Sequence, residues 1–202
     1  GFLKNEGVDV EINYQTDLDQ WGMGPNGALA INLVGTYTGS YATQPIPPAI
    51  YEAAGLPEPH VYECSGRYGN VCGTPTPKWR HKLRVTWSAP WDFDISVAWR
   101  FIGGSSVDFN TDNPLLNGLC GGPCGDLADA HIGTYNYFDL AGTWTVREGV
   151  NLRAGVTNLF DKDPPILDSS YVAVPPYGSG NTFPQVYDSL GRVFFVGATL
   201  KY

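Results

Sequence analysis

The sequence predicts an all-β fold: about seven antiparallel strands of an up-and-down transmembrane β-barrel that is only part of a larger barrel. Three observations indicate this fold. Apolar and polar residues alternate with period two in segments of about ten residues. The connections between these segments are alternately short and long, and nearly every charge in them falls on one face. Barrel strands in a bilayer show this pattern, because one face meets lipid and the other a polar lumen.

Seven segments carry the alternation, and each places its apolar side chains on one face. In chain order they span residues 8–16, 28–38, 81–88, 92–101, 137–146, 151–160 and 192–202. Their apolar faces carry Val8, Val10, Ile12 and Tyr14; Leu29, Ile31, Leu33 and Tyr37; Leu83, Val85 and Trp87; Phe93, Ile95, Val97, Trp99 and Phe101; Phe138, Leu140, Trp144 and Val146; Leu152, Ala154, Val156 and Phe160; and Phe194, Val196, Ala198, Leu200 and Tyr202.

The connections favour the same architecture. Short links at 22–27, 88–91 and 147–150 join strands in pairs, while long loops fill 39–80, 102–136 and 161–191. Loops longer than about 15 residues are uncommon in compact domains and are usually functional. Short turns at one end and long loops at the other are typical of outer-membrane barrels.

Charged and aromatic residues are placed as a bilayer requires. The charges on the polar face of the strands are Asp9, Glu11, Lys82, Arg84, Asp94, Arg100, Asp139, Arg153 and Lys201. Arg192 alone falls on the apolar face, and it opens its strand, where a long side chain can snorkel to the interface. Aromatic residues gather at the ends of the apolar faces, as the girdles of membrane barrels do. They are Tyr14, Trp87, Phe93 and Tyr202 at the short-turn end, and Phe101, Phe138 and Phe160 at the long-loop end.

The number of strands indicates that the barrel is incomplete. Among seven antiparallel strands the first and last run in the same direction, so their edges cannot close as an antiparallel pair. Bacterial single-chain barrels have an even number of strands, at least about eight. The alternative from another class is a soluble, secreted β-sandwich binding module with disulfide-stapled loops, which alternation by itself also allows.

The amino-acid composition limits which kinds of partner are expected. The chain has 25 glycines, 16 prolines and 13 % aromatic residues, which favours strands and turns over helices. Twelve basic residues against twenty acidic ones give a net charge of −8 without a basic cluster, so a nucleic-acid partner is not expected. Residues 1–20 are polar and not the apolar start of a signal peptide, so either a leader has been removed or the chain does not begin its gene.

Four cysteines form two close pairs in Gly- and Pro-rich loops, Cys64 with Cys72 and Cys120 with Cys124. An even number in this arrangement predicts two local disulfides in an oxidising compartment. Free thiols and a four-cysteine zinc site are the alternatives, although the spacings fit no common zinc motif.

No motif predicts catalysis, a cofactor or a metal. The G-x-G-x-x-G at 22–27 is followed by a strand, whereas dinucleotide binding needs a helix there. His60, His81 and His131 are isolated in the sequence, and the acidic loop around Asp108 lacks the twelve-residue calcium pattern. We therefore expect no enzyme.

Several motifs resemble the C-terminal signature of TonB-dependent outer-membrane receptors. The most specific is LRAGVTNLFDKDPP at 152–165, followed by Tyr187–Asp188 and Gly191–Arg192; NEGVDVEINY at 5–14, WRHKLRVTW at 79–87 and YFDL at 137–140 also fit. The signature residues are Asn158, Leu159, Phe160, Asp161, Pro164, Pro165, Gly191, Arg192 and Tyr202. The resemblance implies that residues 1–202 are one section of a barrel of about 22 strands whose lumen holds an N-terminal plug.

The resemblance also implies a function. It is that of a barrel-wall portion of an outer-membrane receptor for active uptake of a scarce ligand such as a siderophore, cobalamin or a carbohydrate. The partners would be outer-membrane lipid, the rest of the barrel, the plug, and the TonB protein through the absent N-terminal part. Candidates for lumen-facing plug contacts are Lys82, Arg84, Asp94, Arg100, Asp139 and Arg153, and candidates for ligand contacts in the loops are Tyr51, Tyr62, Tyr68, Tyr171 and Tyr177.

Within the signature, physical chemistry predicts structural roles. Asn158 and Asp161 can bond to nearby backbone where a strand ends. Pro164 and Pro165 lack N–H groups and stop the ladder. Gly155 and Gly197 lie on the lumen face, where the missing side chain allows a plug to approach closely.

Overall fold

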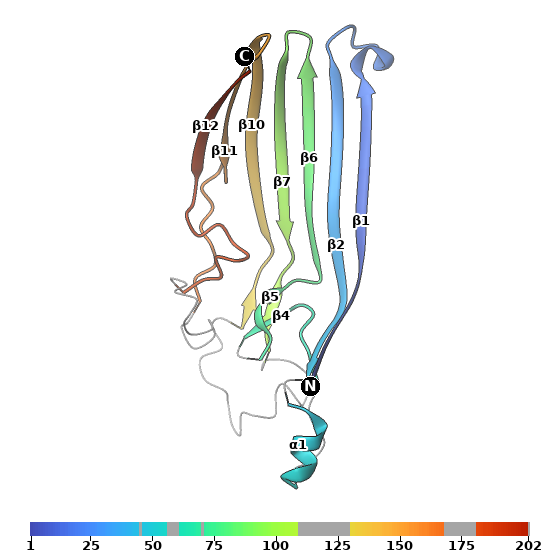
Figure 1. Cartoon of the computed structure of the whole chain (residues 1–202), viewed down its shortest axis with the longest axis vertical. Helices are drawn as coiled ribbons and strands as arrows, with labels where there is room; N and C mark the ends of the chain where they lie inside the picture. The colour runs from blue at the N-terminus through green and yellow to red at the C-terminus, as the bar shows by residue number, and fades with distance from the viewer. Residues whose placement is uncertain (45, 56–60, 70, 109–129, 168–180, 202) are drawn as a thin grey trace.

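The computed structural model describes residues 1–44, 46–55, 61–69, 71–108, 130–167 and 181–201. Its main sheet has the strand order β1-β2-β6-β7-β10-β11-β12, which is the order of these strands in the sequence, and every neighbouring pair is antiparallel (Figure 1). The strands are β1 (Phe2–Asp17), β2 (Ala28–Gln44), β6 (Trp79–Ala89), β7 (Phe93–Ile102), β10 (Tyr135–Arg147), β11 (Val150–Thr157) and β12 (Val193–Leu200). The predicted up-and-down sheet is confirmed.

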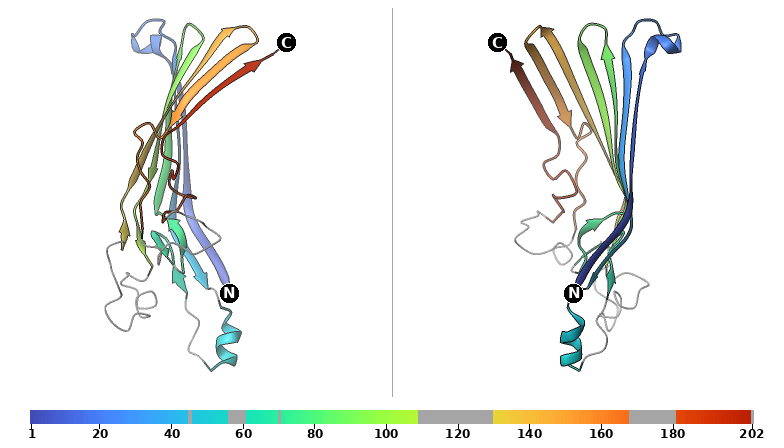
Figure 2. Two further views of the ribbon diagram at one scale, coloured as in Figure 1. Left: turned by 90° about the vertical axis from the view of Figure 1, so that its left-hand side faces the viewer. Right: turned by 45° about the vertical axis from the view of Figure 1, so that its right-hand side comes forward.

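The sheet is a single open layer whose edges are β1 and β12 (Figure 2). Both edge strands run toward the end that holds the short turns, so they cannot pair antiparallel with each other. A two-residue strand, β3 (Tyr62–Glu63), adds to the outer end of β2. The sheet is therefore a section of barrel wall, as the strand number predicted.

The first hairpin is longer than predicted. β1 begins at Phe2 instead of Val8 and β2 continues to Gln44, with a register shift between Glu6 and Gly7. A short 3₁₀ helix, η1 (Leu18–Trp21), lies in the turn between them. Residues 2–7 do not alternate cleanly, but ladder hydrogen bonds need no alternation, so the pairing continues past the residues that signalled it.

The long loops hold secondary structure that the sequence prediction left out. They contain helix α1 (Pro48–Ala53) and a second sheet of order β5-β4-β8-β9, in which β4 and β8 are parallel. The small strands are β4 (Arg67–Gly69), β5 (Gly73–Thr76), β8 (Ser105–Val107) and β9 (His131–Ile132). Strands of two to four residues are too short for period-two alternation to show, which is why the sequence did not reveal them.

The apolar face of the main sheet is uncovered. Val8 at one edge is 60 % exposed, Val97 in the middle is 45 % exposed, and Val196 at the other edge is 86 % exposed. Among the described residues no second sheet packs against this face, so the β-sandwich alternative is wrong. In the described part of the chain, no helix is both long and apolar enough to cross a membrane.

Aromatic rings line both ends of this apolar face. At the long-loop end the rings touch in a continuous row, with the Trp99 ring stacked on Phe138 and the His81 ring stacked on Phe101. The Trp79 indole donates to His81 Nδ1 at 2.9 Å, so His81 belongs to this girdle. At the short-turn end Trp87 meets Trp91 edge-on, and its indole donates to the Asn26 carbonyl at 2.8 Å. The ring contacts agree with the predicted girdles in the described part of the chain, which does not include Tyr202.

Two glycines on the polar face serve a different purpose from the one predicted. A Cβ on Gly155 would lie 2.5 Å from the Phe195 ring, and one on Gly197 would lie 2.8 Å from Nε of Arg153. The sheet's own side chains from the paired strands fill these spaces, as cross-strand aromatic packing over glycine does. The expected direct approach of a plug at these two glycines is therefore wrong.

Adjacent positions in the middle of β7 test which face meets lipid. Replacing Val97 with Lys puts a cation on the apolar face and, near the bilayer midplane, costs about 2–4 kcal/mol. We expect Val97→Lys to reduce the heat-modifiable, membrane-inserted form of a barrel that contains this chain. Ser96→Lys, one residue earlier and on the polar face, should leave that form near its normal level. Equal losses in both variants would contradict the assignment of faces.

Candidate functional site

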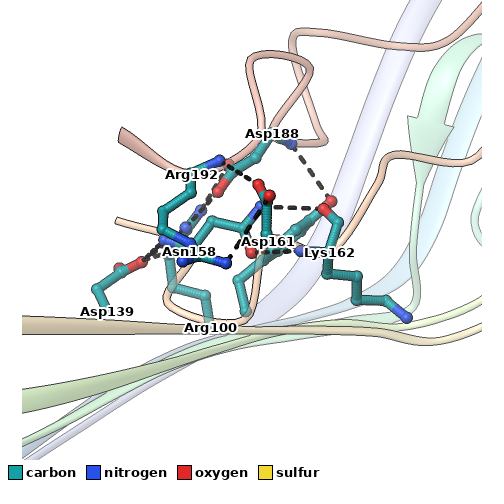
Figure 3. Close-up of polar contacts among 8 residues, drawn as sticks. Arg100, Asp139, Asn158, Asp161, Lys162, Asp188 and Arg192 are labelled. Atoms are coloured by element: carbon teal, nitrogen blue, oxygen red, sulfur yellow. Dashed lines mark hydrogen bonds and ion pairs between the residues drawn. The ribbon is translucent and has the colours of Figure 1, made fainter. Parts of the chain in front are cut away.

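The best-defined polar site lies on the polar face near the long-loop end and consists of Arg100, Asp139 and Asp188, which we call the arginine clamp (Figure 3). Nε and Nη2 of Arg100 each donate to Asp139 at 2.9 Å. Nη1 and Nη2 donate to the two carboxylate oxygens of Asp188 at 2.9 and 2.5 Å. The three side chains are only 20–23 % exposed, so the guanidinium joins two carboxylates largely away from water.

Strand register positions the clamp. β7 and β10 pair so that Arg100 lies opposite Tyr137, with Asp139 at the diagonal position on the same face. The guanidinium carbon lies 5.0 Å from the centre of the Tyr137 ring, and the Tyr137 hydroxyl accepts the backbone N–H of Asp188 at 3.3 Å. Arginine suits this position because its planar fork can bind two carboxylates while it stacks on a ring.

A turn that follows β11 extends the clamp. The backbone N–H of Asn158 donates to Asp139 at 3.0 Å. The Asn158 side chain bonds both to the N–H and to the carbonyl of Lys162, and Oδ1 of Asp161 accepts the N–H of Arg192 at 2.7 Å. Asn158 and Asp161 adopt φ values of 55° and 54°, a left-handed conformation that Asn and Asp tolerate best after glycine. The predicted bonding to nearby backbone is confirmed for Asn158, whereas the backbone partner of Asp161 lies 31 positions away, so that local prediction is wrong for Asp161.

The remaining signature residues fit around this turn. Gly191 has φ 68°, and a Cβ there would lie 2.9 Å from Oδ1 of Asp161. Nη2 of Arg192 lies 3.8 Å from Oδ2 of Asp161 in an exposed ion pair. The side chain therefore contacts the turn and does not only extend toward the membrane interface. Leu159 donates its N–H to the Phe138 carbonyl at 2.7 Å, while the exposed Phe160 ring meets Phe138 edge-on. β11 already ends at Thr157, before the turn at Asn158, so Pro164 and Pro165 lie beyond the ladder and do not stop it as predicted. Tyr202 lies outside the described residues.

A buried cluster, which we call the loop core, joins the long loops. Its members are Tyr68, Val107, Ile132, Tyr137, Leu167, Phe183 and Tyr187. They come from all three long loops and from the outer end of β10, and Tyr137 links the cluster to the clamp. Burial raises the pKa of the Tyr187 phenol above its ordinary value. The outer loops are therefore tied to one another and to the polar face of the sheet.

The loop core corrects one predicted ligand contact. Tyr68 is completely buried in the cluster, so it cannot contact a ligand at the surface as predicted. Tyr51 in α1 and Tyr62 in β3 are half-buried and keep an accessible part. Tyr171 and Tyr177 lie outside the described residues.

A disulfide braces the first long loop. Cys64 and Cys72 are bonded with their Cα atoms 5.3 Å apart, which confirms that predicted pair, while Cys120 and Cys124 lie outside the described residues. Beside the disulfide, Oδ2 of Asp108 accepts the N–H groups of Val71 at 2.8 Å and Cys72 at 3.0 Å. This carboxylate also connects the first long loop to β8 and hence to the second loop.

Glu63 fastens the same loop to β2. Its carboxylate accepts the Ser40 hydroxyl at 2.6 Å and the backbone N–H groups of Tyr41 and Ser65 at 2.7 and 2.9 Å. Burial acts to raise the pKa of Glu63, but these hydrogen bonds outweigh it and hold the pKa below its ordinary value. The loop is thus attached to the wall by a charged acceptor as well as by its own strand pairing.

The other predicted luminal residues lie on the polar face but not in the clamp. Lys82, Arg84, Asp94 and Arg153 are exposed, and none of them forms an ion pair with another described residue. The structure thus divides the six candidates, since Arg100 and Asp139 are engaged within the wall and these four are not. Across the described residues, no group of three or more His, Cys, Asp or Glu side chains is placed to hold a metal ion.

Asp188, Lys162 and Tyr137 are the site residues that sequence reasoning did not select. Asp188 is 88 positions from Arg100 and has no local spacing signal, although it is part of the Tyr187–Asp188 motif. Tyr137 contacts Arg100 through the face of its ring, and Lys162 bonds to Asn158 through its backbone atoms. Neither kind of contact produces a recognisable pattern in the sequence. The only available signal was their place within motifs of the resemblance.

Residues 3–159 match the family model described as "TonB dependent receptor-like, beta-barrel". The chain belongs to this family. In membrane barrels the polar face of the wall turns to the lumen and the apolar face turns outward.

Solved structures support the fold of this barrel section. The chain is similar to a mutant of the ferric enterobactin receptor PfeA from Pseudomonas aeruginosa, with 16 % identity and a TM-score of 0.53. It is also similar to another PfeA mutant in complex with enterobactin, with 17 % identity and a TM-score of 0.52. Each comparison covers 98 % of this chain and 22 % of the receptor chain. A comparison with curated protein sequences finds no match.

Removing the cation of the clamp should destabilise the wall. Arg100→Met leaves the Asp139 and Asp188 carboxylates close together and without their cation, which costs roughly 3 kcal/mol for a largely buried pair. We expect the receptor to lose its folded form at a lower urea concentration, measured by heat modifiability on gels. Arg192→Met, which removes only an exposed ion pair, should shift the midpoint by less than about 1 kcal/mol equivalent. Similar shifts in the two variants would refute the clamp.

Removing the disulfide should loosen the outer loops without unfolding the barrel. In the Cys64→Ser, Cys72→Ser double variant, the eight-residue separation gives a loss of about 2–3 kcal/mol, confined to the loop that the bond closes. We expect faster cleavage within residues 61–78 by an added protease, with the heat-modifiable barrel retained. Unchanged cleavage would show that the loop core and Asp108 hold this loop without the bond.

Proposed function

We propose that this chain forms the C-terminal section of the wall of an outer-membrane receptor that takes up a ferric siderophore using energy delivered through TonB. One observation carries the proposal: a continuous apolar sheet face is exposed from β1 to β12, while the charges of the strands lie on the opposite face. Water disfavours such an apolar face and hydrocarbon accommodates it. Membership of a receptor family also favours transport over catalysis.

The ligand class rests on the relatives. Both structures compared above are of one receptor, the ferric enterobactin receptor PfeA, and in one of them it is in complex with enterobactin. This supports a siderophore over cobalamin or a carbohydrate. Tyr51 and Tyr62, which are partly accessible in the first long loop, are candidate ligand contacts at the outer mouth.

The rest of the receptor supplies the other partners. This chain spans 22 % of the length of the receptor compared, so the plug, the remaining strands and the segment that contacts TonB are part of the proposal. Lys82, Arg84, Asp94 and Arg153 face the lumen without ion-pair partners among the described residues, and we place them against the plug. Outer-membrane lipid covers the apolar face.

Growth under iron limitation tests this function. Cells that lack the complete receptor should lose growth on ferric enterobactin, used as the probe siderophore, and regain it when the gene is restored. Restoration should fail in cells without TonB, because the family couples uptake to TonB. The deletion strain could instead grow like the wild type on ferric enterobactin, ferrichrome and other ferric siderophores but grow poorly on cobalamin or a carbohydrate. That result would reassign the ligand.

A further inference from the structure

The apolar face of the main sheet is hollowed between β7 and β12. The hollow is a groove of about 610 Å³, and most of the residues that line it belong to the apolar face of β7, β10, β11 and β12. Strand register explains its floor, because Gly142 of β10 lies directly opposite Ala154 of β11. Larger apolar side chains surround this floor, and they are Phe93, Leu140, Trp144, Leu152, Val156 and Phe194. Two small residues side by side among large ones thus leave a depression in the surface.

The groove begins near the short-turn end of the wall, which is at the top of Figure 1. Along β10 its lining extends from Trp144 to Leu140, a distance of about 13 Å. That length fits within one leaflet, since half of a hydrocarbon core about 30 Å thick is roughly 15 Å. In outer-membrane barrels the short turns face the periplasm. The groove therefore lies at the depth of the periplasmic leaflet.

A β-bulge turns an arginine onto the same face at the mouth of the groove. The register of β10 and β11 shifts between Thr145 and Arg147, so that Arg147 lies opposite Val150, which in turn lies opposite Leu200 of β12. Residues directly opposite each other in an antiparallel pair share a face, and Val150 shares the apolar face with Leu152. Without the shift, alternation would put Arg147 on the polar face together with Thr145. Bulges commonly re-aim a side chain in this way.

The re-aimed guanidinium is available to a ligand. Arg147 is exposed and takes part in none of the ion pairs between described residues, although Glu148 follows it in the chain. It is three residues from Trp144, whose ring borders the groove and is 48 % exposed. A guanidinium can bind a phosphate with two hydrogen bonds, and indole rings favour the headgroup level of a bilayer. A phosphate-binding cation thus lies at the open end of an apolar groove.

We propose that the groove and Arg147 form a binding site for one anionic phospholipid of the periplasmic leaflet, and this proposal rests on the proposed function. Arg147 binds the lipid phosphate, and an acyl chain lies over Gly142 and Ala154. The general lipid cover of a barrel needs neither a hollow nor a cation, whereas this site selects a lipid by its headgroup. A lipid fits better than a second copy of the chain, because the groove is continuous with the lipid-facing surface and its cation matches a phosphate in charge.

Photo-cross-linking of the complete receptor in lipid nanodiscs tests the site. The probe is phosphatidylglycerol with a diazirine in one acyl chain, added as a minor component to phosphatidylcholine, and peptide mass spectrometry locates its adducts. We expect the adducts to concentrate on β10 and β11 around Gly142 and Ala154, above their level on the apolar faces of β2 and β6. Unlabelled phosphatidylglycerol should compete for these adducts more strongly than phosphatidylethanolamine, because only the former carries a net negative charge.

Two variants with matched controls separate the headgroup contact from the groove. Arg147→Gln should lower the adduct yield about tenfold, the effect of losing a hydrogen bond to a charged group. Lys201→Gln, at the same end but one residue after Leu200 and so on the opposite face, should not lower it. Ala154→Leu keeps the face apolar but fills the floor, and should lower the yield about fourfold for each methylene that it displaces. Val85→Leu, on the same face outside the groove, is its control.

The outcomes distinguish this site from the proposed function. Each yield is normalised to the heat-modifiable receptor in the sample. An Arg147→Gln yield equal to that of the wild type, or adducts spread evenly over the apolar face, would refute the site and leave the barrel wall standing. Adducts absent from the whole apolar face would contradict the proposed function as well. A groove that alone stays unlabelled, in a receptor that migrates as a dimer, would assign the groove to a second copy and overturn the proposal.

Discussion

The hydrocarbon interior of a membrane offers no hydrogen-bond partner to a peptide group and little solvation to a charge. A sheet in that medium must pair its backbone within the sheet and turn its charged side chains to one face. In this chain, both requirements are met across the full width of the main sheet. Val97 and its outward neighbours are exposed without protein cover, and Ala98, Ser96 and the charged residues share the other face. Aromatic rows lie at both ends of the apolar face, as they do at the interfaces of membrane proteins.

The same constraint explains why the strongest polar contacts are concentrated at the outer end. A charged side chain that faces the lumen can form an ion pair either within the wall or with a group that fills the lumen. Arg100 forms its ion pairs with two carboxylates of its own chain. Through Asp188 the guanidinium holds the segment that leads into β12, and through Asp139 it reaches Asn158 in the turn after β11. Through Tyr137 it reaches the loop core. One guanidinium thus couples the barrel wall, the last strand and the outer loops, which explains why the signature residues gather around it.

The predictability of each part follows from the range of the interaction that determines it. Alternation is local, so the strands around Val85, Val97 and Leu140 could be predicted with their faces and their order. The ladder of residues 2–7 and the short strands β4 and β8 depend on pairing with distant partners, which alternation does not reveal. The bond between Arg100 and Asp188 spans 88 positions, and the burial of Tyr68 depends on three loops packing together. The bonding of Asn158 was predictable because Asn bonds to neighbouring backbone at strand ends, whereas the partner of Asp161 is 31 positions away and could not be predicted in this way.

The central claim is that one face of this sheet meets lipid and the other a water-filled or protein-filled lumen. Its most direct test is a nitroxide scan of residues 93–101 along β7 in the complete receptor reconstituted in lipid. Collision with dissolved oxygen, which concentrates in hydrocarbon, is compared at each site with collision with a water-soluble nickel chelate. We predict that oxygen accessibility peaks at Ile95, Val97 and Trp99 and falls at Asp94, Ser96 and Ala98, with a period of two. Oxygen accessibility without this period, or with its maxima at the even-numbered positions, would contradict the account.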